Sequence, residues 1–446
     1  MELNGGYQEI ALTADRKFST FLPTKIVPSM KYNEVFCGPG GMRQEVEMLA
    51  DSGTTFTSAS NKIVIPIRSQ GIIDWKHACI EFNASAVVTG GTAGTFYFTN
   101  GIWNLFSRVK VVCNGSIIFD QPFKNLWRST QYTFCRAPSI DASIGDACWG
   151  VSSSANRIAR VGGYNYMIPL DIPFLVSEEV PFKSVTNFQI ELELAPDNSV
   201  ICYGTQVGGT PKYTINNPRI RVQEVFYQPD LMQAFDAMKA IMYPFTTYKV
   251  AQVNVPSGSN TNQINIPIKV QGVKRIFAFM KTASDIGNPA VADVWTDLFR
   301  YANATDVQLK VDNYYYPPQP IKLGGAVGGQ EGYLSLFRGM DRYESYSDII
   351  ERRNNGETGY LSVNDFPITY SDFTSNKFMT CIDLKTFAEH SEQALTKFDT
   401  TPGNTTIQLN LNFQAGSPTS NSVIYIVVVH SSLIIQYSNG TFTLIE

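Results

Sequence analysis

Charge is scarce in this 446-residue chain, and so is histidine. Charged residues make up 17 % of the sequence, against about 25 % in an average soluble domain, and their formal sum is −4. No block of like charge occurs, which excludes the basic tail typical of proteins that bind nucleic acid. The three histidines (His77, His390 and His430) are never three or four residues apart, so the helical zinc motif is excluded. We expect no enzyme activity, no metal or cofactor, and no specific nucleic-acid binding.

Long apolar runs and closely spaced cysteines are also missing. The longest apolar run, at 423–429, is far too short to cross a bilayer. The opening stretch, MELNGGYQEIALTADRK, lacks the apolar core of a signal peptide. The seven cysteines are odd in number and widely spaced, which is typical of free thiols in a reducing compartment. These absences predict a protein that is made inside a cell without a signal peptide.

What the sequence does have is a long internal repeat. NKIVIPIRSQGI, at 61–72, returns as NQINIPIKVQGV at 262–273, with seven of twelve positions identical. Further matches keep the same order along the chain: 109–111 with 309–311, 126–128 with 336–338, and 188–195 with 407–413. The spacing between matches grows from about 200 to 219 residues, far beyond the ~20–50 residues of solenoid repeats. A whole domain has therefore been duplicated.

Strand patterns dominate both halves of the chain. In FQIELEL, at 188–194, apolar and polar residues alternate strictly, which indicates a strand with one buried face. Many short strands with few helices indicate a sandwich or barrel, and about eight strands per repeat is the jelly-roll number. The sequence thus predicts an all-β fold of two tandem jelly-roll sandwiches, with Gly- and Ser-rich loops at 139–163 and 203–210.

Helical spacing is limited to a few short segments. The clearest, PDLMQAFDAMKAIM at 229–242, places apolar residues on one stripe between the two repeats, and Pro244 would end it. We expect shorter helices near 331–339, 345–353 and 386–397. From the N-terminus, the predicted organisation is an arm at 1–30, a first jelly roll at 31–228, a linker helix at 229–244 and a second jelly roll at 245–446.

Two corresponding stretches carry a resemblance to a known family. FSRVKVVCNGSIIFD (106–120) is followed by the helical FKNLWRST, and DVQLKVDNYYYPPQP (306–320) is followed by EGYLSLFRGM. Each is a strand, a turn with Asn or Gly, and a helix. This pattern resembles the double jelly-roll major capsid proteins of tailless DNA viruses, the adenovirus hexon lineage, and is similar to the virophage and polinton types.

The resemblance implies a structural protein of the virion. Such a chain would form homotrimeric, pseudo-hexagonal capsomers that tile an icosahedral shell, with six similar lobes around a threefold axis. The implied partners are other copies of the chain, neighbouring capsomers, penton and minor capsid proteins, and an internal membrane in some virus groups. The family has no catalytic motif to transfer.

The most distinctive local stretch is NYYYPPQP, at 313–320. Its tyrosines, Tyr314, Tyr315 and Tyr316, have two interpretations. Either they form an aromatic contact between subunits, because tyrosine is favoured at interfaces, or they are the aromatic edge of a strand tucked into its own sandwich.

Two other function classes use similar folds. A glycan-cleaving amidase built from two jelly rolls would need carboxylates at the domain junction, where the sequence offers Glu224, Asp230 and Asp236 without a surrounding motif. A glycan-binding protein would need an aromatic platform or an Asp/Asn cluster in one set of loops.

Overall fold

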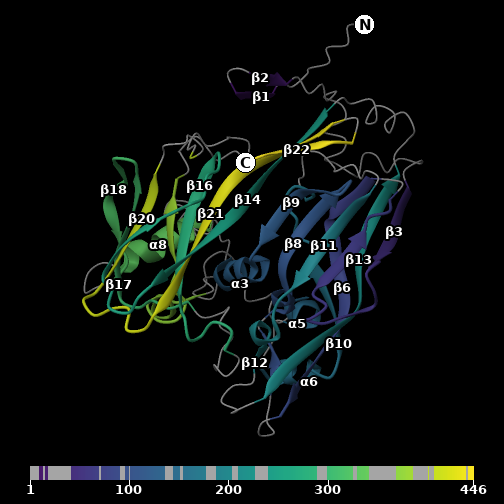
Figure 1. The fold of residues 1–446 in the computed structure, drawn as a ribbon, viewed down its shortest axis with the longest axis horizontal. Helices are drawn as coiled ribbons and strands as arrows, with labels where there is room; N and C mark the ends of the chain where they lie inside the picture. The colour runs from purple at the N-terminus through teal and green to yellow at the C-terminus, as the bar shows by residue number, and fades with distance from the viewer. Residues whose placement is uncertain are drawn as a thin grey trace, which may run out of the picture.

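The fold was analysed in a computed structural model of the chain. The described residues are 10–13, 16–18, 42–69, 72–90, 96–99, 101–135, 144–150, 154–176, 187–202, 209–226, 240–288, 299–324, 329–340, 368–384, 400, 406–437 and 440–446. Near the N-terminus, β1 (Ile10–Thr13) and β2 (Arg16–Phe18) pair with each other as a small ribbon. The remaining strands form two sandwiches, the first roll and the second roll, that lie side by side (Figure 1).

The first roll consists of two antiparallel sheets. Its long-strand sheet has the order β10-β6-β13-β3, and its short-strand sheet has the order β5-β11-β8-β9. The strands are β3 (Met42–Leu49), β5 (Lys62–Pro66), β6 (Ile72–Thr89), β8 (Phe106–Cys113), β9 (Ser116–Pro122), β10 (Tyr164–Pro169), β11 (Phe188–Leu194) and β13 (Thr210–Phe226). Smaller elements are β4 (Thr55–Phe56), β7 (Tyr97–Phe98), β12 (Ile201–Cys202) and the 3-10 turns η1 (Ile102–Leu105) and η2 (Asp197–Ser199).

The second roll repeats this topology strand for strand. Its long-strand sheet has the order β19-β16-β21-β14, and its short-strand sheet has the order β15-β20-β17-β18. The strands are β14 (Ala240–Val255), β15 (Thr261–Asn265), β16 (Val273–Thr282), β17 (Ala304–Val311), β18 (Tyr314–Lys322), β19 (Thr380–Asp383), β20 (Ile407–Phe413) and β21 (Ser422–Tyr437), with β22 (Phe442–Ile445) added beside β21. Each strand of the two main sheets of one roll therefore has a counterpart in the other, whereas β4, β7, β12 and β22 have none among the described strands. The predicted duplication and double jelly roll are confirmed.

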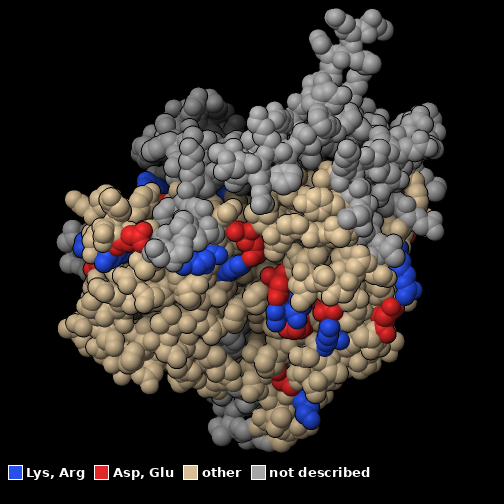
Figure 2. All heavy atoms as spheres, turned by 45° about the horizontal axis from the view of Figure 1, so that its top comes forward, with Lys and Arg blue, Asp and Glu red and all other residues tan. Residues whose placement is uncertain are grey.

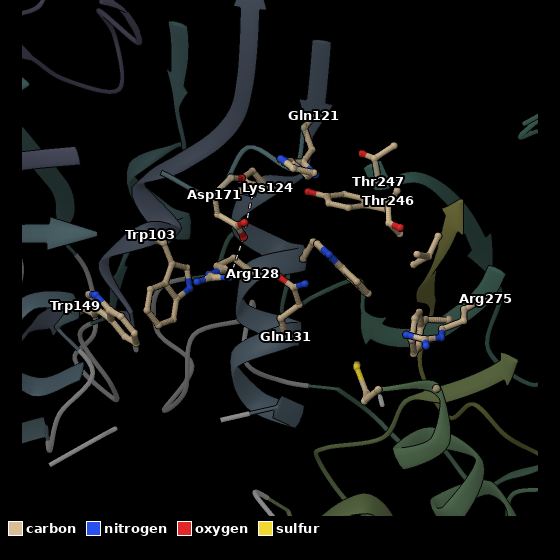
Figure 3. Close-up of a pocket in the computed structure, with 17 residues that line it drawn as sticks. Trp103, Gln121, Lys124, Arg128, Gln131, Trp149, Asp171, Thr246, Thr247 and Arg275 are labelled. Atoms are coloured by element: carbon tan, nitrogen blue, oxygen red, sulfur yellow. Dashed lines mark hydrogen bonds and ion pairs between the residues drawn. The ribbon is translucent and has the colours of Figure 1, made fainter. Parts of the chain in front are cut away.

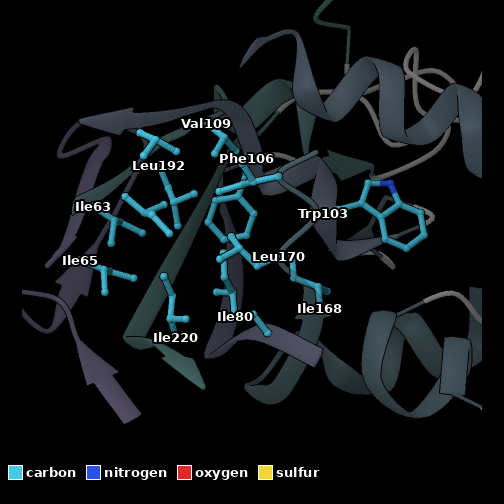
Figure 4. Close-up of a cluster of buried hydrophobic side chains, with 14 of the residues drawn as sticks. Ile63, Ile65, Ile80, Trp103, Phe106, Val109, Ile168, Leu170, Leu192 and Ile220 are labelled. Atoms are coloured by element: carbon cyan, nitrogen blue, oxygen red, sulfur yellow. The ribbon is translucent and has the colours of Figure 1, made fainter. Parts of the chain in front are cut away.

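Each sandwich closes because the strands bury alternate side chains between the two sheets. In the first roll, Ile63 and Ile65 of β5 face Ile80 of β6 and Ile220 of β13 across the interior (Figure 4). All four side chains are buried. The strict alternation of FQIELEL has the same origin, because β11 sits between β5 and β8 and points Phe188, Ile190, Leu192 and Leu194 inward.

The prediction of a linker helix is wrong for the part of 229–244 that the structure describes. Residues 227–239 lie outside the described residues, but 240–244 belong to β14, which pairs with β21 along its whole length. The apolar residues here alternate sides: Ile241 and Tyr243 join the core of the first roll, whereas Met242 packs with Leu433 and Ile435. Pro244 is tolerated because β14 is an edge strand of the main sheet path.

Two other expectations need correction or fall outside the described residues. The predicted loop at 139–163 contains α5 (Ile144–Trp149) and α6 (Ser154–Arg160), which are tied together by the ion pair of Arg160 with Asp146. The predicted loop at 203–210 ends in Thr210, the first residue of β13. Its other described residue is Gly209, since 203–208 lie outside the described part.

The helices of the second half are partly as predicted. The structure has α8 (Gly329–Gly339) where a helix at 331–339 was expected, and a short α10 (Tyr370–Phe373) follows. The expected helices at 345–353 and 386–397 lie outside the described residues. Within the described part of the chain, the structure has no helix both long and apolar enough to pass through a membrane.

Candidate assembly surfaces

The first of three candidate surfaces is the joint between the two rolls, which is built around α3 (Lys124–Cys135). This helix follows β9 of the first roll and lies between the rolls (Figure 1). The Trp127 ring packs on Tyr248 of β14 and Phe277 of β16, with ring centroids 5.2 and 5.5 Å apart. Phe134, about two turns further along the same face of the helix, packs on Phe299, with ring centroids 5.4 Å apart. The helix thus belongs to the first roll in sequence but shares the core of the second.

The edge strand β9 is also covered at this joint. Phe119 of β9 lies 5.9 Å from Phe245 of β14, and Phe174 lies 5.8 Å from the same ring. Ile241, Tyr243 and Phe245 of the second roll are buried in the hydrophobic core of the first. Apolar burial of this extent is typical of a permanent contact, because both surfaces would be exposed if the rolls separated.

A small polar group and a cavity lie within the joint (Figure 3). The Lys124 ammonium donates to the Asp171 carbonyl at 2.6 Å, and Arg128 pairs with the Asp171 carboxylate at 2.9 Å. The Lys124 ammonium holds the pKa of Asp171 below its usual value, and burial lowers the pKa of Lys124 itself. Among the described residues the buried Tyr248 hydroxyl has no hydrogen-bond partner, and burial raises its pKa.

The cavity has a volume of about 570 Å³. Three of its lining residues are tryptophans, Trp103, Trp127 and Trp149, and both rolls contribute to the lining. Figure 3 shows the Asp171 group on the α3 side and Arg275 on the opposite side, in the second roll. Within the described residues, no group of three or more His, Cys, Asp or Glu could hold a metal ion.

The carboxylates that an amidase would need are not gathered in the described structure. Glu224 is buried on β13 and accepts a hydrogen bond from the Ser69 hydroxyl at 2.6 Å. Asp230 and Asp236, the other two candidates at the junction, lie outside the described residues.

The second surface is the tyrosine edge, formed by Tyr314, Tyr315 and Tyr316 on β18. Among the described strands, β18 is the outer strand of its sheet and pairs only with β17. The three tyrosines are 80 %, 49 % and 42 % exposed. The interpretation in which they tuck into their own sandwich is therefore wrong, and the subunit-contact interpretation stays a prediction. Tyr315 also lies 5.9 Å from the Lys310 ammonium.

The third surface is the charged face, formed by Glu45, Glu47, Glu81, Arg219 and Arg221 on the outward side of the first long-strand sheet. Arg219 pairs with Glu81 at 2.7 Å, and Arg221 pairs with Glu47 at 2.7 Å and Glu81 at 3.0 Å. The hydrogen bond from Arg219 lowers the pKa of Glu81. Elsewhere, charges form small mixed clusters on a mainly uncharged surface in the view of Figure 2.

Sequence reasoning missed two of these surfaces. The joint was marked in the sequence by Leu126, Trp127 and Phe134, whose spacing places them on one helical face. The charged face was marked by opposite charges on two alternating strands, MRQEVEML and RIRVQEVF, which pair directly in the structure.

Comparisons with known proteins bear on the fold. No protein-family model matches the chain, and no curated protein matches it. Several solved structures do match the chain. PBCV-1 VP54, fitted into a reconstruction of the virophage Sputnik, matches with a TM-score of 0.59 at 12 % identity, covering 91 % of this chain and 96 % of that one. The Faustovirus major capsid protein matches at 0.56 and 8 % identity, covering 91 % of each chain.

The mavirus major capsid protein matches with a TM-score of 0.50 at 10 % identity, covering 90 % of this chain and 89 % of that one. At such low identity these matches establish the architecture, and they extend over almost the whole of each chain. This chain therefore has the double jelly-roll fold found in the major capsid proteins of icosahedral DNA viruses.

Proposed function

We propose that this chain is a major capsid protein, the repeating subunit of an icosahedral virus shell. The observation that carries the proposal is the duplication: the same jelly roll is built twice, in tandem, and the two copies are already joined edge to face. The likeness to the PBCV-1, Faustovirus and mavirus proteins supports it.

Homotrimers are the assembly that suits this shape. Three copies of a two-lobed chain give six similar lobes around a threefold axis, so that a closed, symmetric particle has a nearly hexagonal outline. Hexagonal units fill a lattice, whereas a two-lobed monomer does not. The low charge and the 12 % aromatic content suit a chain whose surface is largely covered by neighbours.

The tyrosine edge is a proposed contact within such an assembly. An outer strand with unpaired backbone groups is a place where another chain can add, and proteins usually blunt such edges with charge or proline. Here β18 carries three exposed tyrosines next to three prolines, which block strand addition while leaving rings to pack against a partner.

The wider assembly follows from the proposed role. Its partners would be neighbouring capsomers, penton and minor capsid proteins, and, in some virus groups, an internal membrane. Its location would be the virion. A structural role gives the chain no need of an active site, and neither a glycan-cleaving nor a glycan-binding function gains a specific observation among the described residues.

Electron microscopy of the purified chain tests the proposal. We expect class averages with six lobes around a threefold axis, and closed shells when the protein is concentrated or expressed with penton and minor proteins. Particles that show only two lobes at every concentration would contradict the capsomer.

A further inference from the structure

The helix that follows the fourth short-sheet strand, β9 or β18, occurs in both rolls, as α3 and α8. Aligning the two helix ends, Cys135 with Gly339, places Trp127 opposite Glu331, so this structural alignment replaces the sequence match of 126–128 with 336–338. In this alignment the sides that face the parent roll also agree. The Ser129 hydroxyl of α3 donates a hydrogen bond to the Asn104 side chain of the first roll. Its counterpart in α8, Tyr333, packs on Phe373 of the second roll. Both helices therefore turn corresponding residues toward their parent roll, although α3 lies against η1 and β8 and α8 lies against β18 and β19.

The opposite side of each helix has a different character. In α3 it is the buried stripe that makes the joint, consisting of Leu126, Trp127, Thr130 and Phe134. In α8 the same four positions form what we call the α8 stripe, consisting of Gln330, Glu331, Leu334 and Arg338, and all four residues are exposed. Leu334 is 41 % exposed although it is a large apolar residue.

The sheet face that receives the helix differs in the same way. The α3 stripe lies on the outward face of the second long-strand sheet, where Tyr248, Val429 and Arg275 share one row. The corresponding row of the first roll is Glu45, Gln223 and Asp74. The repeat itself aligns Asp74 with Arg275, since both lie three residues after the matched glycines Gly71 and Gly272. Glu45 of this row belongs to the charged face, and Gln223 and Asp74 continue the row beside it.

Helix stripe and sheet face have therefore changed together. Inside the chain, an apolar stripe meets a largely apolar face, as in the pair of Trp127 with Phe277. Their counterparts are Glu331 and Lys76, two exposed residues of opposite charge. The β6 strand bulges between Asp74 and Cys79, and Lys76 lies in this bulge. Glu45 and Arg221 are paired with each other beside it, at 3.3 Å.

We infer that the α8 stripe of one copy docks on the charged face of the first roll of a second copy. The inference rests on the proposed self-assembly and specifies its contact. The joint within the chain supplies the precedent, and the paired change from apolar to charged supplies the complementarity. A contact of this kind is heterologous, because unlike surfaces meet, so it repeats around a ring until the ring closes.

The docking of the α8 stripe is then electrostatic and adds to the aromatic contact proposed for the tyrosine edge, whereas the joint within a chain is apolar. Salt screens exposed charges, with a Debye length of about 10 Å at 0.1 M and about 3 Å at 1 M. We expect high salt to weaken association between copies while leaving each two-roll chain folded. A polar contact of this type lets subunits associate reversibly before a shell closes.

Two variants separate the two surfaces. The donor variant, Glu331→Lys with Leu334→Glu, alters the α8 stripe alone. The acceptor variant, Lys76→Glu with Leu49→Glu, alters two exposed residues on strands of the charged face, and Leu49 is 62 % exposed on β3. A matched control, Ile117→Glu, changes a residue that is 57 % exposed on β9 and belongs to neither surface. Because all these side chains are exposed, we expect wild-type circular dichroism and melting in every variant.

The experiment is the solution mass of each protein and of an equimolar mixture of the donor and acceptor variants. The wild type and control should be trimers, and each variant alone should weaken association at least about tenfold. The mixture retains one intact donor and one intact acceptor, so it should form a one-to-one dimer and no larger ring. Trimeric variants, or trimers in the mixture, would overturn the assigned surfaces while leaving self-assembly intact. A monomeric wild type would instead overturn the proposed function and the inferred contact with it.

Discussion

The two rolls share one topology, yet their long-strand sheets are buried differently. In the first roll, β6 alternates between buried and more exposed residues over much of its length. In the second, β16 and β21 bury nearly every side chain, on both faces. One cause is α3, which packs on Tyr248 and Phe277 of the second sheet, and α8 also contacts β19 of that sheet. The corresponding face of the first roll carries paired charges instead. The pattern along a strand thus records what lies on each face, and the same fold can have either pattern.

Removing the Trp127 ring at the centre of the joint should have the largest effect on the free energy of unfolding. Trp127 is 7 % exposed and packs on two aromatic rings of the other roll. We expect Trp127→Ala to destabilise the chain by about 3–5 kcal/mol, the usual range for deleting a buried large aromatic side chain. Urea unfolding measures the change. Leu334→Ala, in the exposed counterpart stripe, is the control and should stay within about 0.5 kcal/mol of wild type; equal effects would contradict the comparison.

Breaking an ion pair should destabilise the folded chain more in the joint than on the charged face. Asp171→Ala leaves Lys124, whose side chain is only 13 % exposed, without its carboxylate partner. We expect a loss of about 1–3 kcal/mol, moderated because Asp171 itself is 37 % exposed. Glu47→Ala on the charged face should cost no more than about 1 kcal/mol. Thermal unfolding of both variants decides the order, and a larger loss for Glu47→Ala would refute it.

The second sheet should also make the chain sensitive to acid. His430 of β21 is fully buried, and burial lowers its pKa despite the nearby Glu446 carboxylate. The folded state therefore keeps the imidazole neutral, while the unfolded chain takes up a proton as the pH falls below about 6.5. Stability should be complete above that pH and should decline as the pH falls through the unfolded pKa towards the folded one.

The variant that tests this acid effect is His430→Gln, compared with wild type between about pH 7 and 5. His430→Gln should flatten the pH dependence of the melting temperature, whatever it does to the stability at neutral pH. Identical pH profiles for His430→Gln and wild type would show that this histidine does not titrate on unfolding.

The tyrosine edge should have the smallest effect on the folded chain. Replacing Tyr314, Tyr315 and Tyr316 together by serine removes rings that are largely exposed, so unfolding should shift by no more than about 0.5 kcal/mol. Association between copies should weaken, because the proposed contact loses its aromatic area. Analytical ultracentrifugation checks this. Unchanged association with unchanged stability would remove the tyrosines from the contact.

The sequence predicted the fold well because the internal repeat and the period-two alternation of the strands can both be recognised without knowing which strands pair. Residues 188–194 alternate as a half-buried strand must, and the matched segments at 61–72 and 262–273 cover β5 and all but the first residue of its counterpart β15. The start of β14 was mistaken for a helix end, because Ile241 and Met242 also fit a helical stripe. Tertiary pairing with β21 decides that they alternate between two cores.

The candidate surfaces were harder to predict because they depend on what covers each face. The tyrosines of β18 fit either a buried edge or an exposed one, and only their place on the outer strand settles it. Helical spacing at 126–134 was visible in the sequence, but nothing local says that the stripe packs on the other roll rather than on its own. The difference between α3 and α8 became readable only when their positions in the two rolls could be compared.

The solution mass of the wild-type chain, by size exclusion with light scattering, tests the central claim most directly. The account holds that one joint lies within the chain and that its equivalent forms between copies. At low salt it predicts a trimer, three times 49.6 kDa, that dissociates towards a folded two-roll monomer as salt is raised. A chain that stays monomeric at every salt and protein concentration would contradict it.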